Sequence, residues 1–335
     1  EQFELDLNQS SAFDAYEGSA NLVYACQRKG EPVILRISFN QERTLDQIRA
    51  EVDFINYLAE NRVRVARPLP AVDGAFVGEY ALDGSSLYFV CFQKGAGMRV
   101  PDNGYRYRED APIEEYFQNW GAVLGQMHAF SKTYQPPTDQ VLRPDWFHLY
   151  ARRLDLDALI PTELPRTYEK IQALLEEVRS LPRDNAGYGL IHGDFNDGNF
   201  TVDYTNGNIT VFDFDDCCTF WFAYELAAAW EGGIGRVMFR PLAERQAFMT
   251  HYMEQIFEGY NQENHLPKVW IDRIPLFIRL IQVEEFLHYV RYYDDADEET
   301  RAHLNYLITC IDNDLPYMGF FDPIYSPKHP FLLTK

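Results

Sequence analysis

The sequence predicts an α+β protein with two lobes, a small antiparallel β-sheet followed by a larger and mainly helical region. Short apolar or alternating runs, separated by turn residues, recur between residues 21 and 92 and are typical of strands. After residue 98 the apolar residues recur instead at helical spacing over long stretches. We therefore expect a first lobe at residues 1–93 and a second lobe at residues 94–335.

The composition limits the classes of protein to which the chain can belong. It has 335 residues, of which 46% are hydrophobic, and a formal net charge of -21. So acidic a chain does not offer the basic surface that nucleic acids and anionic membranes bind, and we expect neither as a partner. Five scattered cysteines fit reduced thiols better than a disulfide framework. We expect a soluble, cytoplasmic protein, and the oligomeric state stays open.

One helix is predicted in the first lobe, at residues 44–60. Thr44 and Gln47 have the spacing of a capping box, which marks the start of a helix. Glu51 lies on the apolar face of this helix and is expected to point toward the core. Arg36 lies in an apolar strand, where its charge needs a partner. We predict an ion pair between Arg36 and Glu51.

The segment before the first clear strand is predicted to contain a short helix and a turn. Residues 1–17 are predicted to contain a short helix around Phe13. A turn follows, and Gly18 and Ser19 lie within it. Such a turn can lay backbone N–H groups over phosphates, although a single glycine is as often only a turn.

The strongest chemical signal is the polar segment at residues 192–199, which follows a short apolar strand. An Asn-Gly pair at 206–207 predicts a hairpin with a type I′ turn. The hairpin is expected to return the chain so that Asp213 lies beside Asp194 and Asn199. Oxygen ligands that converge from two neighbouring strand ends suit Mg²⁺.

The order His-x-Asp-x-x-x-x-Asn and then Asp-Phe-x resembles the catalytic and metal-binding loops of protein kinases. The glycine after the histidine, Asp213-Phe214-Asp215 and Tyr224-Glu225-Leu226-Ala227 more closely resemble the aminoglycoside phosphotransferase/choline kinase family. Within that family, the sequence pattern most resembles type II homoserine kinase and the bacterial stress-response kinases. The resemblance implies a protein-kinase-like fold, ATP as donor with GTP left open, and Mg²⁺. The alternative is that these loop residues only cap turns.

The resemblance also implies a role for each polar residue of the motif. Asp194 would be the catalytic base, which accepts or orients the hydroxyl of the acceptor. Asn199 and Asp213 would hold Mg²⁺. Asp215 would assist a second ion, with a capping role as the alternative. Three further residues are expected to support or pack the structure rather than to react: His128, His192 and Glu225.

The nucleotide side of the predicted site comes from the first lobe. The turn with Gly18 and Ser19 falls where the family has its nucleotide-covering loop. The pair of Arg36 and Glu51 matches the Lys–Glu pair of kinases. Because arginine replaces lysine, it stays open whether Arg36 touches phosphate or only orients the loop. The resemblance places the adenine-binding backbone at four residues: Cys91, Phe92, Gln93 and Lys94.

The predicted function is ATP-dependent transfer of the γ-phosphoryl group to a hydroxyl of a small molecule, such as an amino alcohol, a sugar or an aminoglycoside-like compound. Between Asp213 and Tyr224 there is no room for the activation segment of protein kinases. A Ser/Thr protein kinase of the stress-response type and an inactive nucleotide-binding protein are the alternatives. Candidate acceptor-binding residues are Asp197, Glu231, Glu284 and Tyr292. For Glu284 a solvated helix face is the slightly favoured alternative.

Overall fold

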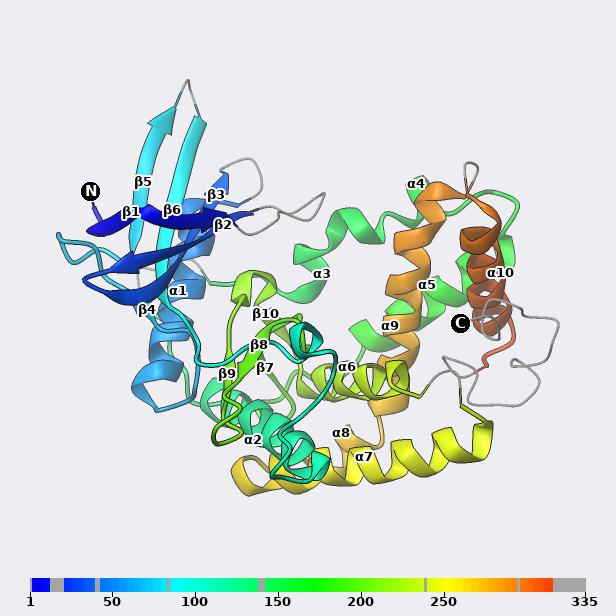
Figure 1. The fold of residues 1–335 in the computed structure, drawn as a ribbon. Coiled ribbons are helices and arrows are strands. Elements are labelled where there is room, and N and C mark those ends of the chain that lie inside the picture. The colour runs from blue at the N-terminus through cyan, green and yellow to red at the C-terminus, as the bar shows by residue number, and fades with distance from the viewer. Residues whose placement is uncertain are drawn as a thin grey trace.

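The computed structural model describes residues 2–12, 21–39, 43–82, 85–137, 142–237, 240–293 and 296–315. The N-terminal part is an antiparallel sheet with one helix, and the C-terminal part is mainly helical (Figure 1). This arrangement confirms the predicted α+β class. The last long strand of the sheet ends at Gln93, and the proposed lobe boundary there stays a prediction. Within the described ranges, no helix combines the length and the apolar character needed to cross a lipid bilayer.

Six strands form the N-terminal sheet, and every pairing is antiparallel. In order across the sheet they are β1 (Leu5–Ala12), β2 (Asn21–Arg28), β3 (Glu31–Phe39), β6 (Ser85–Gln93) and β4 (Pro68–Leu69), and β5 (Val77–Leu82) also pairs with β6. Within residues 1–17, where a short helix around Phe13 was predicted, residues 5–12 form β1. This segment is rich in Asn and Ser, which are weak helix formers, and the edge of β2 offers it backbone partners. Phe13, Gly18 and Ser19 lie outside the described residues.

Helix α1 (Leu45–Glu60) lies against this sheet and begins at the predicted cap. The amide of Gln47 donates to Oγ1 of Thr44 at 3.2 Å, and the amide of Thr44 donates to Oε1 of Gln47 at 3.0 Å. The capping box is therefore complete. Glu51 is fully buried on the apolar face of the helix, as predicted.

The helical part contains the remaining helices of the described chain. These are α2 (Ile113–Ser131), α3 (Trp146–Leu149), α4 (Leu156–Leu159), α5 (Pro165–Arg179), α6 (Phe222–Gly235), α7 (Leu242–Glu263), α8 (Lys268–Ile271), α9 (Ile274–Tyr289) and α10 (Glu298–Asp312). Helix α2 packs along α7, and α6 packs against α9 (Figure 1). Helix α6 is buried along most of its length, so it is the central helix on which the site is built.

Two short pairs of strands carry the polar motifs. Strand β7 (Tyr188–Ile191) pairs with β10 (Cys218–Trp221), and β8 (Phe200–Val202) pairs with β9 (Ile209–Val211). The predicted hairpin is present, but the type I′ turn is wrong. Only the glycine of the Asn-Gly pair has a positive φ, of 77°. The loop is longer because Asp203 closes it, accepting from the amide of Gly207 at 2.7 Å.

Candidate active site

The catalytic loop (residues 192–199) connects β7 to β8 and is tied to the end of β9. Nε2 of His192 lies 2.9 Å from the carbonyl oxygen of Phe212. Its ring packs between Phe195 and Phe214, with centroids 5.7 and 4.4 Å away, and only 1% of the residue is exposed. The amide of Asp194 donates to Nδ1 of His192 at 3.3 Å, so the buried ring is bonded to the backbone of the loop, which fits its predicted supporting role.

Asp194 projects from this loop and is held by two amide side chains. Nδ2 of Asn199 donates to one carboxylate oxygen at 2.7 Å, and Nδ2 of Asn196 donates to the other at 2.8 Å. Burial raises the pKa of Asp194, and the neighbouring charge of Asp216 acts in the same direction. A carboxylate with a raised pKa is a better proton acceptor, which suits a general base.

Asp213 follows β9 directly and has a left-handed backbone, with φ 65° and ψ 59°. A non-glycine residue in this region costs of order 1–3 kcal/mol and is typical of functional sites. The amide of Phe212 donates to the carbonyl oxygen of Asn199 at 2.9 Å, so the two segments meet as predicted. Burial, with the charge of Asp215, raises the pKa of Asp213 to about 8. A nearby cation would therefore stabilise its ionised form.

These residues fit a magnesium site. Because Nδ2 of Asn199 is engaged by Asp194, the carbonyl oxygen of its side chain is the atom left for a metal, beside the carboxylate of Asp213. Across the described chain, no group of three or more His, Cys, Asp or Glu side chains could hold a metal ion by itself. Mg²⁺ suits such a sparse donor set, because it usually keeps waters and takes phosphate oxygens as further ligands.

Asp215, in the metal loop (residues 213–216), has partners that the sequence did not predict. Its Oδ2 accepts from Nη2 of Arg43 and from Nδ2 of Asn21, each at 2.9 Å. Its carbonyl oxygen accepts from Nη2 of Arg143 at 2.7 Å and from Arg43 as well. Burial works against ionisation, yet Arg43, Arg36 and Arg143 together lower the pKa of Asp215. Its role toward a second ion stays a prediction.

Arg36 and Glu51 form the predicted ion pair. The two Nη atoms of Arg36 donate to the two carboxylate oxygens at 2.7 and 2.8 Å, and the side chains are 5% and 0% exposed. Burial disfavours the charged guanidinium, but Glu51 holds the pKa of Arg36 above its ordinary value. The guanidinium also lies over the ring of Phe92, 5.2 Å from its centroid. Asp213 and Asp215 act on the same charge, so Arg36 faces the metal loop.

The predicted adenine-binding segment is already bonded within the N-terminal part. Cys91 and Phe92 are buried in β6 between β3 and β4. The amide of Gln93 donates to the carbonyl oxygen of Arg67 at 2.8 Å, and the amide of Lys94 donates to that of Pro32 at 3.4 Å. Contacts of these four residues with adenine stay a prediction.

Glu225, on α6, reaches the catalytic loop. The amide of Gly193 donates to its Oε1 at 3.0 Å, and Glu225 is 1% exposed. The glutamate side chain thus braces the backbone of the catalytic loop, in agreement with its predicted supporting role.

Three of the residues predicted to bind the acceptor come from different elements: the catalytic loop, α6 and α9 carry Asp197, Glu231 and Glu284 respectively. Asp197 pairs with Nη2 of Arg236 at 3.1 Å. Glu284, on α9, accepts from the hydroxyl of Tyr224 on α6 at 2.9 Å. Burial raises the pKa of Glu284 to about 8; Tyr224 opposes this shift, and the charge of Glu231 adds to it. Glu284 is half-buried where α9 packs on α6, so it does not lie on a simple solvated face.

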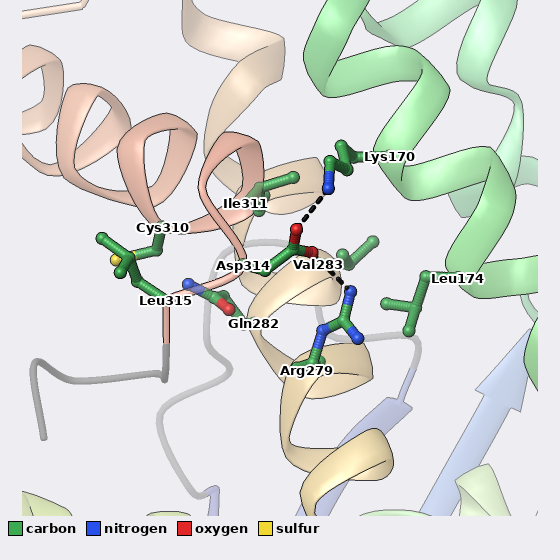
Figure 2. A pocket seen from close by; sticks show the side chains of 9 residues that line it. All are labelled: Lys170, Leu174, Arg279, Gln282, Val283, Cys310, Ile311, Asp314 and Leu315. Carbon is green, nitrogen blue, oxygen red and sulfur yellow. Dashed lines mark hydrogen bonds and ion pairs between the residues drawn. The ribbon is translucent and has the colours of Figure 1, made fainter.

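Two other features of the helical part lie apart from this cluster. Tyr292 is 56% exposed, and its ring lies against that of His288. Figure 2 shows a pocket between α5, α9 and α10, where the carboxylate of Asp314 bonds both Lys170 and Arg279. This pocket shares no lining residue with the predicted site, so it adds nothing to the catalytic assignment.

Four residues that contribute to the site were not predicted from the sequence: Asn21, Arg43, Arg143 and Tyr224. Each is an ordinary polar or aromatic residue outside the catalytic motif, and it gains a partner only when distant segments meet. The strongest signal in the sequence for these partners is the excess of carboxylates at 213–216. It predicts that cationic side chains lie nearby but does not identify them.

Comparisons with known proteins agree with this geometry. Residues 15–261 match the model of the phosphotransferase enzyme family, APH. The chain belongs to this family. Amicoumacin kinase of Bacillus subtilis (strain 168) is 29% identical to it over 307 residues, which are 90% of this chain and 87% of that protein.

Solved structures of related kinases have the same fold. The amicoumacin kinase hAmiN, in complex with AMP-PNP, Ca²⁺ and Ami, superposes with a TM-score of 0.81 and 26% identity, over 94% of this chain and 91% of that one. A microcompartment-associated aminopropanol kinase superposes with a TM-score of 0.68 and 21% identity, over 93% and 92%. The kinase-like fold and the reaction class, phosphoryl transfer to a hydroxyl of a small molecule, are confirmed. The hAmiN complex agrees with the predicted use of ATP and a divalent cation.

Proposed function

We propose that this protein transfers the γ-phosphoryl group of ATP to a hydroxyl of a small, amine-bearing molecule, with Asp194 as base. The observation that carries the proposal is the convergence of Asp194, Asn199 and Asp213 from the two strand ends. Phosphoryl transfer depends mainly on positioning and on neutralisation of charge, which this cluster can supply.

In this mechanism Asp194 accepts or orients the proton of the acceptor hydroxyl. The hydroxyl oxygen forms a bond to the γ-phosphorus, the bond to the β,γ-bridging oxygen breaks, and ADP leaves. Asn199 and Asp213 would hold Mg²⁺, which neutralises phosphate oxygens when bound. Arg36 would orient the metal loop from the nucleotide side, and Asp215 would position Arg43. Gly18, Ser19 and the segment 91–94 would contact the nucleotide.

The carboxylates on the acceptor side support an amine-bearing substrate. Glu284 and Glu231 lie close enough to raise each other's cost of ionisation, and a bound ammonium group would relieve it. Amicoumacin is the first acceptor to test, because two relatives that are similar over about nine-tenths of the chain are amicoumacin kinases, at 90% and 94% coverage. We also propose that the protein works in the cytoplasm, where ATP is present and the five free, buried cysteines stay reduced.

The test is turnover of wild type and Asp194→Asn with Mg-ATP over a panel of acceptors. The panel holds amicoumacin, aminopropanol, choline, homoserine, spectinomycin and a general protein substrate. We expect turnover with an amine-bearing small molecule, about 10²–10⁴-fold lower in the variant because the base is lost. Nucleotide binding should stay within about threefold of wild type, since Asp194 does not hold the nucleotide.

Asp272→Asn, an exposed change on α8, is the matched control and should keep full turnover. Full turnover of Asp194→Asn would contradict the assignment of the base. Phosphorylation of protein alone would favour the protein-kinase alternative. Nucleotide binding without turnover of any acceptor would favour the inactive alternative.

A further inference from the structure

A buried chain of hydrogen bonds runs from the catalytic loop to the end of α7. It begins where the amide of Gly193 donates to Oε1 of Glu225 at 3.0 Å. The other oxygen of Glu225 lies 2.8 Å from Nε2 of His128 on α2. Nδ1 of His128 lies 2.9 Å from the hydroxyl of Tyr260 on α7, and that hydroxyl lies 2.7 Å from Nδ2 of Asn264. The chain joins four segments that are distant in sequence: the catalytic loop, α6, α2 and the C-terminal end of α7.

Only one arrangement of protons satisfies every member of this chain. Burial lowers the pKa of His128, so its ring is neutral and carries one N–H. Burial opposes ionisation of Glu225, but the hydrogen bonds from His128 and Gly193 hold its pKa low, so its carboxylate can only accept. Nε2 of His128 must therefore donate, and Nδ1 must accept from Tyr260. Tyr260 in turn accepts from Asn264, whose side-chain oxygen accepts from Lys132.

Close packing of α2 on α7 makes this chain possible. A Cβ placed at Gly121 of α2 would lie 1.9 Å from a backbone oxygen of α7. A Cβ placed at Gly259 of α7 would lie 1.9 Å from a backbone oxygen of α2. Only glycine allows backbones to approach so closely. The crossing therefore sets the separation of His128 and Tyr260, both of which are fully buried.

We propose that His128 and Tyr260 are positioning residues for phosphoryl transfer. They hold Glu225 in the orientation that receives the amide of Gly193, and so they fix the backbone from which Asp194 projects. Removal of the Tyr260 hydroxyl leaves Nδ1 of His128 without its donor, and the ring can then rotate away from Glu225. The expected change in kcat rests on the proposed function, whereas the expected change in hydrogen exchange of the catalytic loop does not.

The test compares Tyr260→Phe with Tyr252→Phe. Tyr252 lies on the same helix, is fully buried, and donates to the carbonyl oxygen of Ala229 at 3.0 Å, outside the chain to the loop. Hydrogen exchange of the 190–199 segment is measured in both variants, together with kcat and the KM for ATP with amicoumacin as acceptor. For Tyr260→Phe we expect about tenfold faster exchange at the amide of Gly193. We also expect kcat to fall about three- to tenfold with KM for ATP unchanged.

Tyr252→Phe should lose similar thermal stability while exchange at Gly193 and kcat stay at wild-type values. His128→Gln keeps a donor toward Glu225, so it should retain more activity than His128→Ala. Equal exchange at Gly193 in the two tyrosine variants would overturn the proposal. Absence of turnover in the wild type with amicoumacin would count against the proposed acceptor, and the exchange comparison would still decide the positioning role.

Discussion

The proposed nucleotide side and the proposed acceptor side of the catalytic loop differ in how the protein neutralises a carboxylate. On the nucleotide side, Glu51 faces a guanidinium, and both of its oxygens are bonded to Arg36 at 2.7 and 2.8 Å. On the acceptor side, Glu284 is bonded to the hydroxyl of Tyr224, and burial raises its pKa to about 8. The protein itself neutralises the carboxylate of Glu51 with Arg36. The carboxyl group of Glu284 has no such pairing with arginine in these contacts, and a cationic ligand would stabilise its ionised form.

This difference predicts opposite responses to the same kind of substitution. Removing a carboxylate from a buried ion pair leaves an unpaired charge behind, which is expensive. A raised pKa means that ionisation of the carboxyl group costs free energy in the folded protein. Replacing that group with an uncharged one removes this cost. Three substitutions, from the largest expected effect to the smallest, test whether the two sides really differ in this way.

Glu51→Gln should destabilise the protein strongly, because it removes the carboxylate to which both Nη atoms of the buried Arg36 donate. We expect a loss of about 3–5 kcal/mol in the free energy of unfolding, measured by urea denaturation. Glu60→Gln changes an exposed residue at the end of the same helix and should stay within about 0.5 kcal/mol of wild type. A loss below about 1 kcal/mol in the free energy of unfolding for Glu51→Gln would show that the two sides do not differ in how they hold a carboxylate.

Glu284→Gln should instead stabilise the protein at high pH. The folded-state pKa of Glu284 is raised from 4.5 to about 8, so the folded state holds the extra proton. The contribution of this carboxyl to stability is therefore present below pH 4.5 and lost as pH rises through about 8. At pH 9 the variant should exceed wild type by about 1–3 kcal/mol in the free energy of unfolding, and at pH 4 the two should be equal.

The same variant should also weaken binding of an amine-bearing acceptor. We expect about a tenfold rise in KM for the acceptor with KM for ATP unchanged, because the lost charge lies on the acceptor side alone. Glu254→Gln, an exposed change on α7, is the matched control for both measurements. Lower stability at pH 9, or a changed KM for ATP, would show that Glu284 is a structural partner rather than part of an acceptor pocket.

Arg43→Gln should have the smallest effect. The pair of Arg43 and Asp215 has side chains that are 12% and 19% exposed, and Asp215 keeps Asn21 and Arg143 as partners. We expect a loss of about 1 kcal/mol or less in stability, measured by urea denaturation, and about a two- to fivefold change in KM for ATP. Arg49→Gln breaks an exposed pair on α1 and should leave KM for ATP unchanged. A loss as large as that of Glu51→Gln would mean that the metal loop depends on this pair.

The ion pair of Arg36 and Glu51 was predictable because each partner is marked locally. Arg36 interrupts an apolar strand, and Glu51 lies on the apolar face of a capped helix, so each sequence pattern demands a partner. The contacts of Asp215 were not predictable in this way. Its partners Asn21 and Arg43 lie 194 and 172 residues away along the chain, in segments without a charge pattern that points to it.

The sequence by itself determined the two-part α+β architecture, the kinase-like motif and the clustering of Asp194, Asn199 and Asp213. Periodicity, capping and a short hairpin depend on neighbouring residues, so they can be read along the chain. Only the tertiary structure decided which carboxylates are neutralised, that Glu284 on α9 bonds Tyr224 on α6, and that Tyr260 is linked to the catalytic loop through His128 and Glu225. Burial and pairing arise where distant segments meet, and the free energy of a charge depends on those surroundings more than on its place in the sequence.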